Sequence, residues 1–107
     1  MSMSQYSVYV IELDKAILSS RKFRAKNPNY VTGKPCVYVG KTVRTPEERF
    51  QQHKRGYRAA RFVKRFGIRL KPRLFAKYNP MTRKQADEME PELARRLRKR
   101  GYAVWQA

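Results

Sequence analysis

Hydrophobic and polar positions along the chain first predict two strands. Residues 6–13 and 36–40 are rich in β-branched and aromatic side chains, which fit the pleated surface of a buried strand. The intervening residues 15–34 contain Asn-Pro-Asn and Gly-Lys-Pro sequences and many basic side chains. They predict a long connection with room for one helical turn, and connections of this length are often functional.

A capping pattern predicts the first helix. Thr45 supplies a capping hydroxyl, Pro46 occupies the first helical position and Glu48 follows three residues after the cap. Gly56 would end this helix. Residues 58–66 have apolar side chains at helical spacing and predict a second, shorter helix.

A longer helix is predicted near the C-terminus. Thr82 and Gln85 repeat the capping pattern, and an apolar stripe at helical spacing follows as far as Gly101, made up of Ala86, Met89, Leu93 and Leu97. Pro91 falls inside this stripe and should kink or split the helix.

Two further segments are predicted to be extended. Residues 68–74 alternate apolar and cationic side chains, which predicts a strand with one apolar face. Pro72 suggests an edge strand, because proline has no backbone N–H to donate to a neighbouring strand. Residues 102–105 predict a short extended or packing segment at the end of the chain.

The net charge of the chain limits the kinds of molecule that it is expected to bind. The 107 residues include 26 Lys and Arg against 8 Asp and Glu, a formal net charge of +18. Such a self-repelling chain favours a polyanionic partner, with nucleic acid ahead of an anionic membrane. A single cysteine and a single histidine exclude a disulfide framework and Cys-rich or multi-His metal sites. With no apolar stretch long enough to cross a bilayer, we expect a cytoplasmic or nucleoid-associated protein.

A basic tract predicts where nucleic acid would bind. No acidic residue occurs between Phe50 and Ala86, so phosphate contacts are expected there. The predicted contact residues are Lys41, Arg44, Lys54, Arg55, Arg58, Arg61, Lys64, Arg65, Arg69, Lys71 and Arg73. The interleaved aromatic residues fit core packing better than stacking on bases, because most recur at apolar spacings.

Glu90 is the acidic residue whose position is hardest to explain by solvation. It follows Ala86 by four residues and precedes Leu93 by three, which places its carboxylate on the apolar stripe. A buried carboxylate needs a cation, a metal ion or converging donors. A local salt bridge, or a cap for a helix starting at Pro91, remains the alternative.

Arg49, His53, Tyr9 and Tyr38 are ambiguous one by one. Arg49 and His53 are four residues apart and share one face of the first predicted helix. Such a face is more often solvated or in contact with phosphate than catalytic. Tyrosines in strands usually pack in the core.

Taken together, these residues carry a family resemblance. Val8-Tyr9-Val10, then Tyr38-Val39-Gly40, then Arg49 with His53, and later Glu90 occur in an order and spacing that resembles the GIY-YIG nuclease superfamily over residues 6–101. Three departures occur: Ser7 stands in place of the first motif's glycine, the 15–34 connection is longer than usual, and the late asparagine of many members is not evident near residues 102–107.

The resemblance implies a fold and a set of roles. The fold would be of the α/β class (α+β type), a small, mainly antiparallel three-stranded sheet flanked by helices, in a single domain over residues 1–107 with a basic insertion at about 15–35. Tyr9 and Tyr38 would be the motif tyrosines, Gly40 the glycine of close approach, Arg49 the catalytic arginine and Glu90 the ligand of one divalent metal ion. His53 is similar to a histidine present in some members.

Elementary chemistry is compatible with these roles. Magnesium, or manganese, takes few protein carboxylates and several waters, and a single site suits a chain with few convergent acids. Cations around Tyr9 should lower its pKa so that it serves as general base, with His53 as the competing base. Arg49 would hold phosphate oxygens through its fork of donors.

Two functions are therefore compared below. The first is a divalent-metal-dependent endonuclease or nickase acting on nucleic acid, DNA in preference to RNA, and not on a membrane. The alternative is a non-catalytic basic DNA- or RNA-binding module on the same fold, in which Arg49 and Glu90 form a buried pair.

Overall fold

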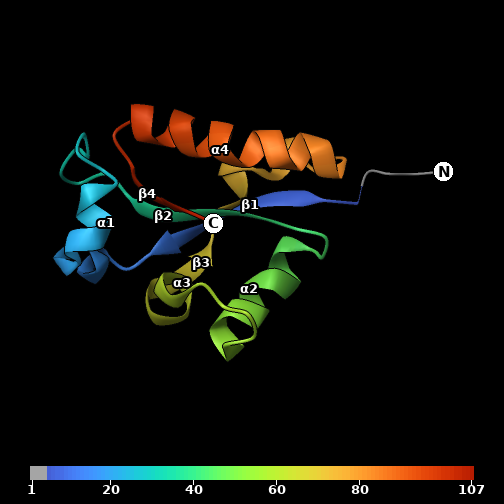
Figure 1. Ribbon diagram of the computed structural model, residues 1–107, viewed down its shortest axis with the longest axis horizontal. Coiled ribbons are helices and arrows are strands. Elements are labelled where there is room, and N and C mark those ends of the chain that lie inside the picture. The colour runs from blue at the N-terminus through green and yellow to red at the C-terminus, as the bar shows by residue number, and fades with distance from the viewer. Residues whose placement is uncertain (1–4) are drawn as a thin grey trace.

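A four-stranded mixed sheet forms the centre of the computed structural model, which describes residues 5–107 (Figure 1). The strand order is β3-β1-β2-β4, with β1 at Ser7–Leu13, β2 at Cys36–Thr42, β3 at Gly67–Leu70 and β4 at Ala103–Gln106. β1 is antiparallel to both β2 and β3, whereas β4 is parallel to β2.

Four α-helices surround this sheet: α1 (Arg21–Ala25), α2 (Pro46–Arg55), α3 (Arg61–Phe66) and α4 (Arg83–Lys99). Helix α4 runs along one side of the sheet, and α2 and α3 lie on the other (Figure 1). Both predicted capping boxes are present, with Thr45 and Thr82 as the N-caps of α2 and α4. Gly56 ends α2 in the left-handed conformation (φ 88°), as its position predicted.

The α+β class is confirmed, but the three-strand expectation is corrected by β4. The closing segment, expected only as extended or packing, pairs with β2 from Cys36↔Ala103 to Val39↔Gln106. Parallel pairing needs a crossover connection, usually a helix, and α4 supplies the helical part of it. The sequence pattern could not indicate this pairing, because its partner lies over 60 residues away.

Three smaller expectations also change. The predicted strand at 68–74 is shorter than expected as β3, because a 3-10 turn begins at Pro72. Its Ile68 is exposed instead of facing the core. Helix α4 continues through Pro91 without being split. The 15–34 connection contains a 3-10 helix at Lys15–Ser19 in addition to α1, and both bury an apolar side chain.

The pleat of β1 and β2 separates two kinds of buried side chain. In the antiparallel register Tyr9 pairs with Gly40, and Tyr38 pairs with Ile11, so these residues share the sheet face that α2 covers. All four of Tyr9, Ile11, Tyr38 and Gly40 are buried. The two tyrosines are therefore core residues as well as candidate site residues. Among the described residues, no helix is both long and apolar enough to cross a membrane; the compartment stays a prediction.

Two asparagine side chains satisfy strand backbone groups that the ladders leave free. Asn27 is buried and donates to the carbonyl of Val104 at 3.1 Å while accepting from the Val104 N–H at 2.7 Å. Asn79 makes the same pair of bonds with Val8. Asn27 thus ties the long 15–34 connection to the edge strand β4.

Replacing Asn27 by leucine should therefore destabilise the protein. The change leaves both backbone groups of Val104 without these partners, and each unsatisfied buried group costs about 1–3 kcal/mol, so we expect a loss of about 2–5 kcal/mol. Urea denaturation measures it. The exposed Asn29→Leu is the matched control and should change the free energy of unfolding by less than about 0.5 kcal/mol. Equal effects of the two changes would contradict this role of Asn27.

Candidate active site

The two motif tyrosines and the single histidine form one buried cluster under the sheet. The Tyr9 hydroxyl and the His53 Nε2 are 2.8 Å apart. The Tyr9 and Tyr38 rings have centroids 6.1 Å apart, and the Tyr38 and His53 rings meet edge to face at 5.5 Å. All three side chains are at most 3% exposed. The structure thus brings together residues that are 44 positions apart in the chain.

Gly40 makes this cluster possible. A Cβ built on Gly40 would lie 2.6 Å from both the Cζ and the hydroxyl oxygen of Tyr9, and 3.0 Å from Cε2 of Tyr38. Since Tyr9 and Gly40 are directly paired across the antiparallel ladder, the tyrosine ring lies over the glycine backbone. The group that approaches Gly40 closely, as the motif predicted, is therefore the Tyr9 ring.

Hydrogen bonding determines which nitrogen of His53 carries the proton. The backbone N–H of Ala60 lies 3.1 Å from Nδ1. A backbone N–H can only donate, so Nδ1 is the acceptor and the neutral ring carries its proton on Nε2. His53 therefore donates to the oxygen of Tyr9. Its only lone pair is already engaged by Ala60.

Burial controls the protonation of this cluster. It raises the pKa of Tyr9 well above its ordinary range, and the neighbouring Tyr38 adds to the increase, whereas the positive charge of Arg49 opposes it. Burial likewise raises the pKa of Tyr38 to about 12. The expectation that surrounding cations lower the pKa of Tyr9 is wrong for the protein alone, because desolvation of the phenolate is the larger effect.

The pKa of His53 shifts in the direction that keeps the imidazole neutral. Burial, with the nearby charge of Arg49 as a further cause, lowers the pKa of His53 to about 4. At neutral pH the imidazole is therefore uncharged. Both tyrosines and the histidine are then neutral, and the charges of the site come from the residues around them.

Arg49 lies beside this cluster on α2 and is anchored by the loop that follows the helix. Its guanidinium donates to the carbonyl oxygens of Arg58 at 2.8 Å and Tyr57 at 3.2 Å, and to the side chain of Gln52. Arg49 is also close enough to influence the pKa of Tyr9, Tyr38 and His53. The loop carbonyls thus hold a permanent positive charge next to the tyrosine hydroxyls.

Glu90 is buried in the middle of α4, as its position on the apolar stripe indicated. It is 4% exposed, and among the residues that the structure describes no donor lies within hydrogen-bonding distance of its buried Oε2. The Lys41 ammonium is the nearby cation, 3.7 Å from Oε2 and 3.5 Å from the carboxylate of Asp87. Burial raises the pKa of Glu90, while Lys41 and the side chain of Gln106 act in the opposite direction.

These observations fit a single divalent cation. A buried carboxylate oxygen without a hydrogen-bond partner is expected to have a cation ligand, and its negative charge reaches the cluster, since Glu90 raises the pKa of Tyr38. Within residues 5–107, no group of three or more His, Cys, Asp and Glu side chains could hold a metal ion. The donor set suits magnesium, which keeps most of its waters.

The structure adds two residues that sequence reasoning missed. Gln106 lies at the end of β4, and its amide is near enough to influence the pKa of Glu90. Asp87, one turn before Glu90, shares Lys41 with it. The helical spacing of 87 and 90 could have indicated Asp87, whereas Gln106 depends on the parallel β2–β4 pairing and had no local signal.

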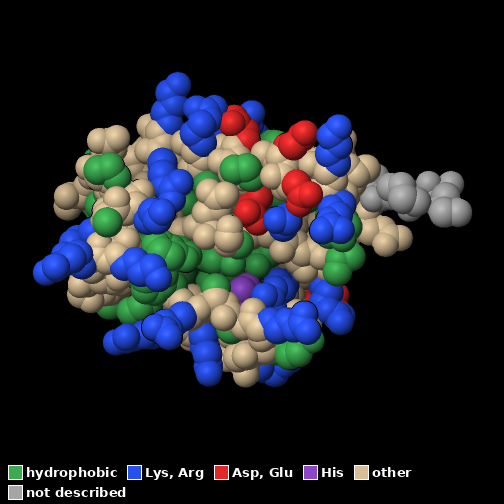
Figure 2. Space-filling model, in the orientation of Figure 1, with side chains coloured by type: hydrophobic (Ala, Val, Ile, Leu, Met, Phe, Trp, Pro, Cys, Tyr) green, Lys and Arg blue, Asp and Glu red, His purple; other side chains and the backbone are tan. Residues whose placement is uncertain are grey.

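The predicted nucleic-acid contacts divide into exposed and engaged residues. Arg69 is paired with Glu12, Lys54 donates to the carbonyls of Lys64 and Gly67, and Lys41 belongs to the Glu90 site. Lys71 is half-buried. The remaining members are all exposed: Arg44, Arg55, Arg58, Arg61, Lys64, Arg65 and Arg73. In Figure 2, Lys and Arg side chains lie to one side of the histidine, while most of the visible acidic side chains gather at and below α4.

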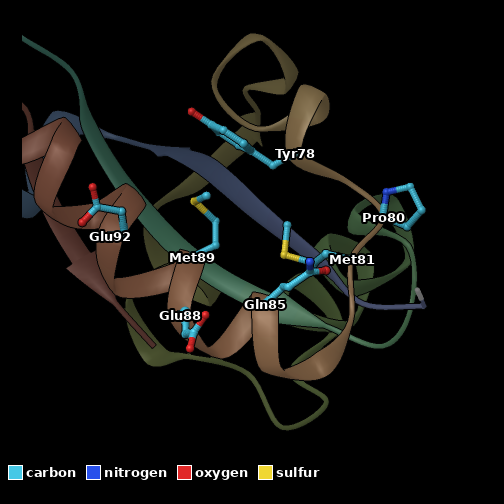
Figure 3. A pocket seen from close by; sticks show the side chains of 7 residues that line it. All are labelled: Tyr78, Pro80, Met81, Gln85, Glu88, Met89 and Glu92. Atoms are coloured by element: carbon cyan, nitrogen blue, oxygen red, sulfur yellow. The ribbon is translucent and has the colours of Figure 1, made fainter. Parts of the chain in front are cut away.

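A separate hollow of about 430 Å³ lies between α4 and the segment that precedes it (Figure 3). Its lining includes Met81, Met89, Glu88 and Glu92, and none of the candidate catalytic residues. The two carboxylates make this hollow unsuitable for a phosphate backbone. This hollow is therefore distinct from the candidate active site at Tyr9, His53 and Glu90.

Gly40→Ala should disturb the cluster directly. The added methyl group would overlap the Tyr9 ring, so we expect the free energy of unfolding to fall by about 1–3 kcal/mol, as measured by urea denaturation. In a Tyr9→Leu background the shorter side chain leaves room, and the same change should cost much less. An equal cost in both backgrounds would contradict the contact as its cause.

Comparisons with known proteins agree with this geometry. The family model described as the GIY-YIG catalytic domain matches residues 5–103. No curated protein and no solved structure matches the chain. The match covers nearly the whole chain and includes both tyrosines, Gly40, Arg49 and Glu90. The chain therefore belongs to the GIY-YIG family, a nuclease superfamily whose members act on nucleic acid.

Proposed function

We propose that this protein is a divalent-metal-dependent endonuclease or nickase that hydrolyses phosphodiester bonds in DNA. The observation that carries the proposal is the buried carboxylate oxygen of Glu90, which has no hydrogen-bond donor among the described residues and has the Lys41 ammonium only at 3.7 Å. A nucleic-acid-binding protein gains nothing from a buried negative charge facing its ligand. A metal site explains it, because the carboxylate is then paired with a cation.

Glu90 is the residue that would hold the ion, either Mg²⁺ or Mn²⁺. When bound, such an ion would supply positive charge to polarise a phosphate oxygen and to stabilise the departing oxygen. Lys41 supplies positive charge to Glu90 and Asp87 in the protein alone, at distances of 3.7 and 3.5 Å. Gln106 is near enough to orient the Glu90 carboxylate from the sheet side.

The other residues position phosphate and move a proton. Arg49 offers a permanently charged fork that suits non-bridging phosphate oxygens. Tyr9 is the proposed general base, because its oxygen accepts a hydrogen bond from Nε2 of His53 and lies near Arg49, and both interactions favour the phenolate. Tyr38 orients water or phosphate. His53 is a positioning residue in this assignment, since its lone pair is engaged by Ala60.

The alternative, a binding module held together by a buried Arg49–Glu90 pair, lacks that pair. Arg49 donates to Gln52 and to the carbonyls of Tyr57 and Arg58, and the ion-pair partner of Glu90 is Lys41. The Lys41–Glu90 ion pair is the observation that a non-catalytic module also explains, but it leaves the buried Oε2 without a hydrogen-bond donor among the described residues. The Glu90 variant below separates the two functions by experiment.

Glu90→Gln should abolish cleavage and leave the fold intact. The change keeps the size of the side chain and removes the charge that attracts the metal, so cleavage of supercoiled plasmid should fall at least about 100-fold. Affinity for Mn²⁺, followed by electron paramagnetic resonance, should fall with it. The melting temperature should stay the same or rise, because a buried charge has gone.

Asp87→Asn is the matched control for this variant. Asp87 lies one turn away, contacts the same Lys41 and has a side chain that is 48% exposed. It should reduce cleavage by less than about tenfold, since an exposed ion pair contributes little. Should Glu90→Gln melt early yet cut normally when folded, Glu90 is structural and the binding module becomes the better description.

The pH dependence of cleavage distinguishes Tyr9 from His53 as the base. Below a raised tyrosine pKa, the phenolate fraction grows about tenfold per pH unit, so the rate at saturating Mg²⁺ should rise from about pH 7 to about pH 9. A His53 base with a pKa of about 4 would give a rate that is flat above about pH 5. Single-turnover rates on a nicking substrate measure this profile.

His53→Gln provides the second arm of that experiment. The glutamine amide can donate to Tyr9 from about the place of Nε2 but cannot act as a base. It should keep the rising profile with a modest loss of rate, whereas His53→Leu, without a donor, should lose more. An equally complete loss in both variants would assign the proton transfer to His53.

A further inference from the structure

An aromatic cavity adjoins the candidate active site and has no part in the mechanism above. It has a volume of about 610 Å³ and lies between α1, α3 and β4. Phe62, Phe66 and Trp105 contribute half-buried rings to its lining. Figure 2 shows hydrophobic side chains gathered in this region, next to the single histidine.

Two backbone connections link the cavity to the active site. Ala60 lines it and donates its N–H to Nδ1 of His53. Trp105 pairs with Tyr38 in the parallel β2–β4 register, so both side chains lie on the same face of the sheet. The lining of the cavity therefore adjoins the Tyr9–Tyr38–His53 cluster, where the scissile phosphate is proposed to lie.

The rings form an apolar wall of the cavity, with cations around it. Phe62 and Trp105 meet edge to face, with centroids 4.8 Å apart. Lys22 lies over the Trp105 ring at 5.5 Å, and Arg65 lies over Phe66 at 4.9 Å. The lining also includes Arg61 and two serines but no acidic residue. Apolar rings inside and positive charges outside complement a nucleotide, with its flat base and negative phosphate.

The base must be unpaired to use this cavity. In a duplex the faces of the bases are stacked on one another, and bringing one out costs a few kcal/mol. The volume lies in the range of sites for small-molecule ligands, which suits a base that is already out of the stack. The charged rim alone would serve a duplex equally well, so the aromatic interior is the discriminating feature.

We propose that this cavity holds an unpaired base of the DNA strand next to the scissile phosphate, so that gapped, flapped or branched DNA is preferred to intact duplex. This inference rests on the proposed DNA cleavage. It also gives a role to the long 15–34 connection, because Ser19, Ser20 and Lys22 from that segment form one wall of the cavity. The connection would then be a substrate-binding element.

Trp105 is the single tryptophan of the chain, so its fluorescence reports on this cavity directly. The protein is titrated in EDTA, which prevents metal-dependent cleavage, with a 15-nucleotide oligothymidylate and with a blunt duplex of equal length. We expect quenching by the single strand, because a stacked base contacts the indole, and much weaker quenching by the duplex. Equal quenching by both, or none by either, would overturn the proposal.

Phe62→Leu tests the aromatic interior. It keeps an apolar side chain but removes the ring, and loss of one stacking contact of about 1–3 kcal/mol corresponds to an affinity for the single strand about 5- to 150-fold lower. Duplex affinity should change less than about twofold. Tyr102→Leu, a half-buried aromatic residue outside the cavity lining, is the control and should leave both affinities unchanged.

A rim variant keeps the test independent of how well Phe62→Leu folds. Lys22 is exposed and belongs to the lining, whereas Arg73 is an exposed cation outside it. Lys22→Gln should therefore weaken single-strand binding more than Arg73→Gln does. If the two substitutions weaken single-strand binding equally, Lys22 contributes only general surface charge, which contradicts a specific role for the rim of the cavity. Tighter binding of oligouridylate than of oligothymidylate would contradict the assignment to DNA.

Cleavage is measured separately so that the two proposals can fail separately. If Phe62→Leu cuts intact plasmid and flapped DNA with the same ratio of rates as the unchanged protein, the cavity is no substrate site although the nuclease function stands. If single-strand binding depends on Phe62 but no substrate is cut in Mg²⁺ or Mn²⁺, the cavity stands and the nuclease function fails.

Discussion

The hydrogen bond between Nε2 of His53 and the Tyr9 hydroxyl is the contact on which the candidate site depends. It forms only because Gly40 has no side chain, since a Cβ there would lie 2.6 Å from the Tyr9 oxygen. It has a fixed direction because the Ala60 N–H engages Nδ1. One strand pairing, one missing side chain and one loop N–H thus determine how the proposed base is held.

Burial and charge oppose each other around this contact. Burial keeps Tyr9 protonated and His53 neutral, whereas Arg49 favours the phenolate. Glu90 shows the same opposition: its carboxylate is buried and Lys41 compensates it only at 3.7 Å. Clusters of titratable groups with perturbed pKa values are typical of functional sites. The site is therefore poised to gain stability from further positive charge, which is what a metal ion supplies.

Short sequence patterns predicted the helix ends and the buried face of α4, because these features depend on residues close together in the chain. The caps of α2 and α4 follow from the spacing of a threonine hydroxyl and a Glu or Gln side chain, and helical periodicity alone placed Glu90 on a buried face. The parallel pairing of β4 and the position of Gln106 depend on contacts between distant segments, and sequence patterns carry no such information. The direction of the Tyr9 pKa shift failed for the same reason: the cations are visible in the sequence, but the burial that outweighs them is a property of the packed fold.

The protonation of His53 can be measured without ambiguity, because the chain has only one histidine. Long-range ¹H–¹⁵N correlation spectra distinguish the two neutral tautomers and the imidazolium as the pH is lowered. The account predicts a neutral ring with its proton on Nε2 that persists until the pH approaches its lowered pKa of about 4. A proton on Nδ1, or titration near the ordinary histidine pKa of about 6.5, would show that His53 does not hold Tyr9 in the way described.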